Sequence, residues 1–424
     1  MTTPDYLPSG FEYVGGRLQF AHVDLASLAN RFGTPLYVYD AQTLSQAYDA
    51  YANALGSTGL VCFAVKANAS LSLLSLLAKR GAGFDVVSGG ELETVIKAGG
   101  SPANCVFSGV AKSHEEIKRA LQLKIKAINI ESIPELRRVS AVASELGTVA
   151  PITFRINPNV SAKTHPKIST GLKINKFGIP HEEALKAFEL AASLPNVCVV
   201  GIDCHIGSQI TDLAPFAEAA DCIIELARTL KTKGIPLSHI DFGGGLGVRY
   251  RDVDTPPAPA ALVKMLQDKL NEAALSNLEI ILEPGRSLVA TSGVFLTRVE
   301  YVKETPEKRF ALVDAGMNDM VRVAMYDADM PLLAIKASDA RQTYDVAGPI
   351  CESSDVFKKD ILLPALTEGD YLAIAMAGAY GFSMASHYNM RAKVAEVLLE
   401  GGVARLIRKR QTLSALWDDE IYGP

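Results

Sequence analysis

Short apolar runs alternate with longer segments of helical periodicity from Pro35 to Arg286. The short runs are rich in β-branched residues and end in Gly, Ser, Asn or Asp. They are Leu36–Tyr39, Leu60–Val65, Phe84–Val87, Cys105–Phe107, Ala127–Ile130, Ile152–Ile156, Val197–Cys204, His239–Phe242 and Glu279–Leu282. We expect the first run to lead into the fold or to lie outside its ring, which leaves eight strands. Eight strands alternating with helices over about 250 residues predict an α/β fold, a TIM-like (β/α)8 barrel. Near-continuous apolar strands are typical of such a buried ring.

Helix signals lie between these runs. The sequences Ser88-Gly-Gly-Glu91 and Ser113-His-Glu-Glu116 are capping boxes, in which the serine and the glutamate satisfy backbone N–H groups at a helix start. The segment 71–80 is followed by Gly81, and a glycine at this position often ends a helix. The alternation therefore predicts helices between strands.

The pattern changes after Arg286. Six further runs look like strands without long helices between them: Val294–Glu304, Phe310–Val313, Thr343–Val346, Tyr371–Met376, Ala392–Leu399 and Val403–Arg408. The 424 residues also exceed the size at which one hydrophobic core usually suffices. We therefore predict a barrel over 35–290, a mainly antiparallel β domain over 291–424, and an N-terminal segment, 1–34, that packs with the β domain.

Charge and composition exclude some classes of protein. The net charge is -5, so no excess of Lys and Arg is present to neutralise nucleic-acid phosphates. The first 20 residues lack the basic start and apolar run of a signal peptide, and no apolar stretch reaches the roughly 20 residues that span a bilayer. The six cysteines form no CxxC pair, which favours reduced thiols. We expect a cytoplasmic protein with no nucleic-acid or membrane partner.

Chemically distinctive residues follow the predicted barrel strands. In such barrels the chemistry lies at the C-terminal ends of the strands, so these residues should meet at one rim. They are Lys66, Asp85, Ser88, Arg155, Asn157, His205, Ser208, the glycines Gly243 to Gly245, and Glu283-Pro-Gly-Arg286.

Each of these residues also has an ordinary structural interpretation. A lysine at a strand end usually extends its amine to solvent, a glycine triplet can be a turn, and a lone histidine or glutamate can be structural. In the barrel context, burial would make the Lys66 amine a nucleophile for an aldehyde. The glycines would let backbone N–H groups approach a phosphate. Glu283 would hold a pyridine nitrogen protonated, and His205 could stack on the ring.

These segments resemble the alanine-racemase-like, fold-type III family of enzymes that use pyridoxal 5'-phosphate. The matching motifs are Phe63-Ala-Val-Lys-Ala-Asn68, His205-Ile-Gly-Ser-Gln209, Asp241-Phe-Gly-Gly-Gly-Leu-Gly247 and Glu283-Pro-Gly-Arg286. The resemblance implies that Lys66 carries the cofactor as an imine, that His205 stacks on its ring and that Glu283 pairs with its nitrogen. The other implied cofactor-binding residues are Asp85, Ser208, Gly243, Gly244, Gly245, Gly285, Arg286 and Tyr380.

Within that family the longest matches are to decarboxylases that act on meso-2,6-diaminopimelate and yield L-lysine and CO2. They cover Val313–Asp319, Cys351–Asp355 and Ala377–Ser386. The resemblance implies that Cys351 is a proton donor supplied by the partner subunit of a homodimer. The implied substrate contacts are Arg286, Arg322, Tyr326, Glu352 and Tyr380; no metal ligand is implied. The chain departs from the family pattern at Val323 and Met330, which bears on Arg322 and Tyr326.

Four alternatives stay open at this point. The protein could be a decarboxylase of the same family acting on ornithine, arginine or carboxynorspermidine. It could be an amino acid racemase, which would need a second base. It could be a non-catalytic carrier of the cofactor, although the large second domain and Cys351 argue against that. It could also be an aldolase that forms a Schiff base without a cofactor. Cys351 could equally be a small buried hydrophobic residue.

Overall fold

The computed structural model describes residues 3–160 and 176–423. The chain forms two compact units, each built from more than one segment. The barrel unit comprises Ser45–Val248 and Pro256–Leu288, and the β unit comprises Met1–Leu44, Arg249–Thr255 and Val289–Pro424. None of the helices within the described ranges is long and apolar enough to cross a membrane.

The barrel unit is a closed ring of eight parallel strands, as the alternating pattern predicted. The strands lie in the order β9-β11-β12-β13-β5-β6-β7-β8, and pairing of β8 with β9 closes the ring. A two-residue strand, β10 (Ile179–Pro180), extends β9. The ring strands are β5 (Gly59–Ala64), β6 (Gly83–Val86), β7 (Cys105–Phe107), β8 (Ala127–Ile130), β9 (Ala150–Asn157), β11 (Val197–Asp203), β12 (His239–Asp241) and β13 (Glu279–Leu282).

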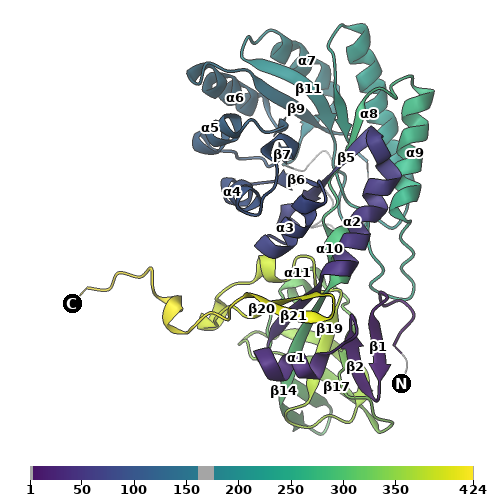
Figure 1. The fold of residues 1–424 in the computed structure, drawn as a ribbon, viewed down its shortest axis with the longest axis vertical. Helices are drawn as coiled ribbons and strands as arrows, with labels where there is room; N and C mark the ends of the chain where they lie inside the picture. The colour runs from purple at the N-terminus through teal and green to yellow at the C-terminus, as the bar shows by residue number, and fades with distance from the viewer. Residues whose placement is uncertain (1–2, 161–175, 424) are drawn as a thin grey trace. The chain divides into compact units, whose positions relative to one another are not determined.

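Helices cover the outside of the ring (Figure 1). The expected capping box is present at Ser113 and Glu116, and Ser88 accepts a hydrogen bond from the Glu91 N–H. These helices are α2 (Ala41–Leu55), α3 (Leu71–Lys79), α4 (Gly89–Lys97), α5 (His114–Leu123), α6 (Ile133–Glu145), α7 (His181–Ala192), α8 (Ala214–Thr232) and α9 (Pro259–Glu272); the short helix α10 (Arg286–Val289) follows the last ring strand at the rim. Inside the ring, side chains such as Cys62, Val106 and Ile281 are fully buried and pack together.

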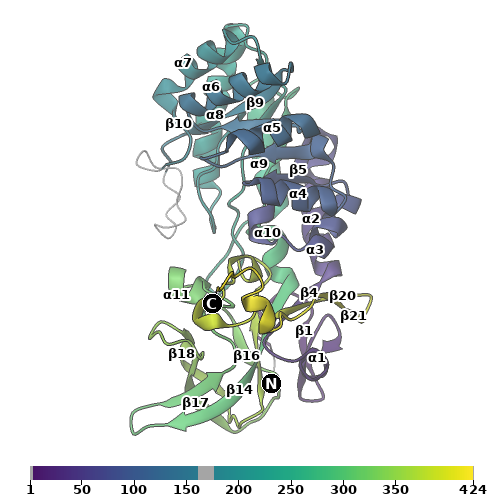
Figure 2. The same ribbon diagram turned by 90° about the vertical axis from the view of Figure 1, so that its left-hand side faces the viewer.

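The β unit is built on a mainly antiparallel sheet, in which β14, β17 and β18 can be followed in Figure 2. Its main path runs β18-β17-β15-β14-β4-β20-β21; β19 also pairs with β14, and β16 pairs with β19. These strands are β4 (Leu36–Asp40), β14 (Gly293–Glu304), β15 (Arg309–Val313), β16 (Leu332–Ala334), β17 (Arg341–Ala347), β18 (Val356–Pro364), β19 (Tyr371–Ala375), β20 (Ala395–Glu400) and β21 (Val403–Arg408); a short helix, α11 (Arg322–Tyr326), precedes β16.

The first predicted strand lies outside the ring. Strand β4 is fully buried between β14, which is antiparallel to it, and β20, which is parallel. The residues before it form a small meander, β1 (Phe11–Val14), β2 (Arg17–Phe20) and β3 (Val23–Asp24), followed by α1 (Leu25–Phe32). The Leu18 N–H donates to the Ile335 carbonyl oxygen at 2.8 Å, which ties this meander to the β unit.

Gly59 shows how closely the ring is packed. Gly59 pairs with Ile280 where β5 meets β13, and a Cβ at position 59 would lie 2.3 Å from the Ile280 carbonyl oxygen. That atom belongs to the backbone of a ring strand, so it has little freedom to move. We expect Gly59→Ala to lower the free energy of unfolding by about 1–3 kcal/mol. Gly90→Ala is the control, because its nearest neighbour would be Ser88 Oγ at 3.7 Å. Thermal unfolding of both variants checks this, and equal melting temperatures would contradict it.

Candidate active site

Lys66 and Asp85 form an ion pair at the C-terminal end of the barrel strands. Lys66 lies in a short 3-10 turn, Val65–Ala67, directly after β5, and its Nζ is 2.7 Å from Asp85 Oδ2 on β6. Asp85 is completely buried, whereas 37% of the Lys66 side chain is exposed. The sequence analysis expected burial of this amine, whereas the Lys66 side chain is only half-buried. A partly exposed side chain leaves a reactant a route to the site.

Three carboxylates from neighbouring strands gather beside this pair. Asp203 ends β11, Asp241 ends β12 and Glu283 follows β13, and their oxygen atoms lie within 4.8 Å of one another. All three are buried, and one oxygen of each accepts no hydrogen bond from the described part of the chain. Burial, followed by repulsion from the other acids, raises the pKa of Asp203 and Glu283 well above the usual values. Burial likewise raises the pKa of Asp241 to about 7.

The glycine triplet after β12 has no room for side chains. A Cβ at Gly243 would lie 2.4 Å from the Cys204 carbonyl oxygen, and one at Gly244 would lie 2.1 Å from the Glu283 carbonyl oxygen. Gly243 and Gly245 also have φ values of +65° and +115°, a backbone region that glycine adopts readily. The Gly243 N–H donates to Asp241 Oδ1 at 2.8 Å. The triplet is therefore a close-packed backbone segment rather than a loose turn.

His205 is half-buried beside the triplet. Its Nδ1 accepts a hydrogen bond from the Gly244 N–H at 3.2 Å, which leaves the ring proton on Nε2. Burial lowers the pKa of His205 well below its usual value, and the charges of Arg155 and Lys66 lower it further. The imidazole is therefore neutral, as a ring that stacks on a cationic heterocycle should be.

Arg286 and Ser208 complete the barrel part of the site. Arg286 begins α10 and is buried, and its Nε and Nη2 lie 3.3 and 3.0 Å from Ser208 Oγ. Gly285 precedes it, and the Gly285 carbonyl oxygen accepts from the Leu288 N–H at 3.2 Å. The structure thus brings Lys66, Asp85, His205, Ser208, Gly243 to Gly245, Glu283, Gly285 and Arg286 together in one unit.

The remaining predicted site residues belong to the β unit. Arg322 is buried at the start of α11, where its guanidinium lies 3.0 Å from Tyr250 Oη and 3.3 Å from Met330 Sδ. Met330, where the chain departs from the family pattern, thus gives Arg322 a sulfur atom as hydrogen-bond acceptor. Tyr326 is half-buried at the other end of the same helix. Tyr380 is half-buried and has a φ of +55°, a backbone strain that tends to occur at functional sites.

Cys351 is exposed, which favours a loop thiol over a buried hydrophobic residue. Its backbone N–H donates to Asn389 Oδ1 at 3.2 Å, and the adjacent Glu352 accepts from the Tyr388 hydroxyl at 2.5 Å. The buried Asp355 fixes the loop by accepting from the Ile350 N–H at 2.7 Å. Cys351 and Glu352 therefore project from an ordered turn of the β unit.

The sequence interpretation missed the groups that surround these residues. Arg155 was noticed at the end of β9 but was given no role, and Asp203 and Glu131 were not selected. Arg155 donates to Glu131 at 3.0 Å, and its Nε lies 3.9 Å from Asp203. The signal for all three was available, because each is a charged residue at the end of an apolar strand.

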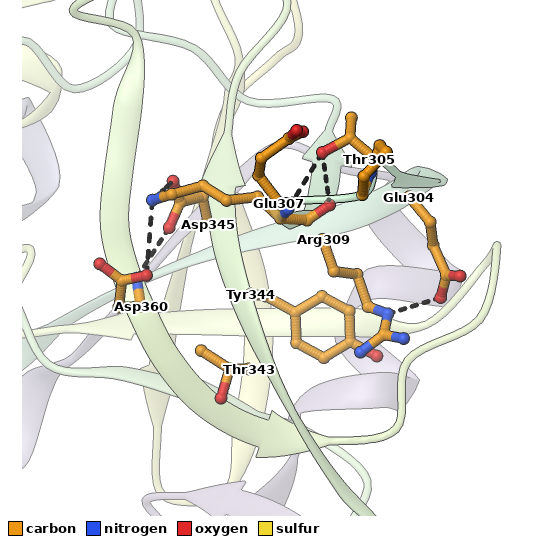
Figure 3. Close-up of a pocket in the computed structure, with 10 residues that line it drawn as sticks. Glu304, Thr305, Glu307, Arg309, Thr343, Tyr344, Asp345 and Asp360 are labelled. Carbon is orange, nitrogen blue, oxygen red and sulfur yellow. Dashed lines mark hydrogen bonds and ion pairs between the residues drawn. The ribbon is translucent and has the colours of Figure 1, made fainter.

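The β unit also carries a cavity of about 360 Å³ that contains none of the predicted residues (Figure 3). Ion pairs join most of the charged groups around it. Lys308 pairs with Asp345 at 2.7 Å and with Asp360 at 3.4 Å, and Arg309 pairs with Glu304 at 2.6 Å. This internal pairing leaves Glu307 as the one charged residue of the cavity for which the described structure gives no ion pair.

Known proteins share both the sequence and the fold. Residues 41–290 match the pyridoxal binding domain of the pyridoxal-dependent decarboxylases. Diaminopimelate decarboxylase of Vibrio cholerae is 52% identical over 96% of this chain and 98% of its own length. The enzyme of Pseudomonas aeruginosa is 50% identical over 98% and 99% of the two chains.

Solved structures agree. Diaminopimelate decarboxylase from M. jannaschii in complex with L-lysine has a TM-score of 0.94, with 42% identity over 98% of each chain. The enzyme from Helicobacter pylori complexed with L-lysine has a TM-score of 0.90, with 45% identity over 94% of this chain and 99% of that chain. The chain belongs to the diaminopimelate decarboxylase family of pyridoxal-dependent decarboxylases.

The residues at the rim fit the cofactor of this family, pyridoxal 5'-phosphate. A protonated pyridine nitrogen would supply the hydrogen bond that Glu283 Oε1 lacks within the described structure. The triplet, which carries no side chains, suits a phosphate, and the half-buried Lys66 side chain suits an aldehyde. The cluster of three buried acids therefore suits a cationic ring.

The raised pKa of Asp241 predicts how the cofactor-free protein responds to pH. Between the ordinary pKa of 3.8 and about 7, the folded state keeps a proton that the unfolded state releases. Stability contributed by this group is therefore lost as pH rises through that window. Asp241→Asn should remove this loss, because an amide does not titrate. Melting temperatures of both proteins at several pH values check this, and parallel curves would contradict it.

Proposed function

We propose that this protein is a carboxy-lyase that converts meso-2,6-diaminopimelate to L-lysine and CO2, the last step of lysine biosynthesis. One observation carries the proposal. Lys66 and the buried acid Glu283 share one barrel rim in a chain that is 52% identical to a diaminopimelate decarboxylase over almost its whole length. The L-lysine in the two solved relatives, where it would be the product, supports the same substrate.

The barrel rim offers residues that would hold the cofactor. Lys66 would carry its aldehyde, and Asp85, 2.7 Å away, would keep the amine in place. Glu283 would accept from the ring nitrogen, and the neutral His205 would pack against the ring. The phosphate would be held by Ser208, Gly243, Gly244, Gly245, Gly285 and Tyr380, with Arg286 nearby.

Pyridoxal phosphate, when bound, supplies a ring that accepts the electron pair left behind by departing CO2. The chain must keep that ring cationic and must place the breaking bond perpendicular to it. Glu283 serves the first task, because an ionised carboxylate at the ring nitrogen favours the protonated form. Arginines that bind the substrate carboxylates would fix the orientation of the breaking bond relative to the ring.

The substrate is a zwitterion with two carboxylates and two ammonium groups. Guanidinium binds a carboxylate through two parallel hydrogen bonds, so we assign Arg286 and Arg322 to carboxylate recognition. Glu352 binds the distal ammonium, and the hydroxyls of Tyr326 and Tyr380 add hydrogen bonds. Burial of both arginines supports this assignment, because a buried guanidinium gains most from a charged ligand.

Cys351 returns a proton to the α-carbon after CO2 has left. We propose that it acts from the partner subunit of a homodimer. Two observations support a partner chain here. Cys351 is exposed on its own chain, and Tyr388 and Met390, in the segment that contacts the Cys351 loop, are 44% and 54% exposed. Exposed apolar side chains next to a functional loop are typical of an interface.

We also propose a cytoplasmic location. All six cysteines are free thiols, and Cys351 and Cys198 are exposed, a state that a reducing compartment maintains.

The decisive experiment is a substrate panel with the purified protein and added pyridoxal phosphate. Lysine should form from meso-diaminopimelate and require the cofactor, while ornithine, arginine and carboxynorspermidine should release little CO2. Lys66→Ala should abolish both turnover and the covalent adduct trapped by borohydride. Preferred decarboxylation of another substrate, or racemisation without CO2, would replace this function with the corresponding alternative.

Replacement of Cys351 tests the proton donor. Cys351→Ala should still bind the cofactor but should lower kcat about 10²-fold or more, which is the usual contribution of a positioned acid. Cys198→Ala is the control, because Cys198 is the other exposed thiol and lies on β11 of the barrel unit. A wild-type rate for Cys351→Ala would assign reprotonation to another group.

A further inference from the structure

Arg155 is the cation that lies against the buried acids without a part in the proposed chemistry. Its side chain is 9% exposed and is held from two directions. Nη1 lies 3.0 Å from Glu131 Oε1, and Nε lies 3.9 Å from Asp203 Oδ2. The ring of Phe177 covers the guanidinium at 4.7 Å. Arg155 therefore has one fixed position, on the Asp203 side of the three-carboxylate cluster.

The cluster needs a permanent positive charge. Three buried carboxylates within 4.8 Å repel one another and tend to keep protons, and a protonated Glu283 could not hold a ring nitrogen charged. Lys66 is the cation on the other side, but its amine is used to attach the cofactor. A guanidinium cannot lose its proton under these conditions. The other titratable groups that face this region are Asp85, Glu131, His205, Cys62 and Cys204.

A purely structural role for Arg155 has a clear basis as well. Its partner Glu131 also accepts hydrogen bonds from the Gly178 N–H at 2.8 Å and from the Gly109 N–H at 3.2 Å, so the pair fixes two rim loops. Lys112 likewise fixes neighbouring segments of the rim through its hydrogen bonds. It is 1% exposed and donates to Glu135 and to the carbonyl oxygens of Gly109 and Asn129, each at 2.7 Å. Lys112 is therefore a matched control, a buried rim cation that does not contact the three acids.

We propose that Arg155 is a positioning residue whose fixed charge, held between Glu131 and Asp203, keeps Glu283 ionised for the cofactor ring. This inference deepens the proposed function and rests on it. Arg155 interacts directly with the charge of Glu283 as well as with Asp203, and acts on these acids rather than on the substrate. Its effect therefore belongs to cofactor binding and its pH dependence, which can be measured without turnover.

The test compares Arg155→Met and Arg155→Lys with wild type and with Lys112→Met, each titrated with pyridoxal phosphate across the neutral range of pH. Arg155→Met should bind the cofactor about tenfold more weakly at neutral pH, and the pH at which half the protein is loaded should rise by about one unit. Without the guanidinium the acids give up their protons only at higher pH. Arg155→Lys, which keeps the charge, should stay close to wild type. Lys112→Met should melt at a lower temperature with an unmoved pH profile.

Three results would overturn the proposal. These are a wild-type profile for Arg155→Met, a shift in Arg155→Lys as large as that in Arg155→Met, and an equal shift in Lys112→Met. If Arg155→Met does not fold, Glu131→Gln decides the matter. It removes the anion that competes for Arg155, so the profile should move to lower pH, and movement to higher pH would refute the proposal. A wild-type protein that binds pyridoxal phosphate but forms no lysine would refute the proposed function alone.

Discussion

Closure of a parallel ring is the constraint from which the rest of this site follows. When β8 pairs with β9, all eight strands end at the same rim, although their ends are spread over more than half of the chain. Backbone pairing alone then brings Lys66 and Asp85, which are close in sequence, next to Asp203, Asp241 and Glu283, which are remote from them. A rim built in this way places reactive groups at the ends of strands or directly after them, so the hydrogen bonds of the ring largely set their spacing.

This arrangement buries charged groups at the rim, and ion pairs between them offset the cost of removing them from water. Cations and anions follow one another around the ring, with Lys112 against Glu135, Arg155 between Glu131 and Asp203, and Lys66 against Asp85. Asp203, Asp241 and Glu283 interrupt this alternation, and burial raises the pKa of all three. A cluster of like charges in a structure where charges are otherwise paired is characteristic of functional sites.

Sequence reasoning located the barrel because its strands are buried on both faces and read as plain apolar runs. It missed β18, whose Lys358-Lys359-Asp360 interrupts any alternation; the strand exists because β17 pairs with it along nearly its whole length. At the site, the residues that resemble known motifs were selected from the sequence, and those of the barrel lie in one unit, while their roles stay predictions. The exposure of Lys66 and the partnership of Arg155 with Glu131 were beyond reach, because both depend on side-chain directions that spacing along the chain does not encode.

Strand β4 has a consequence for how the protein is made. It is synthesised before the barrel, yet both of its neighbours, β14 and β20, come after it. On the ribosome the barrel unit can therefore close before the two strands that will bury β4 have been synthesised. The last ordered strands of the chain thus complete a sheet begun near its start. The nascent protein must keep this early segment from aggregating through most of translation.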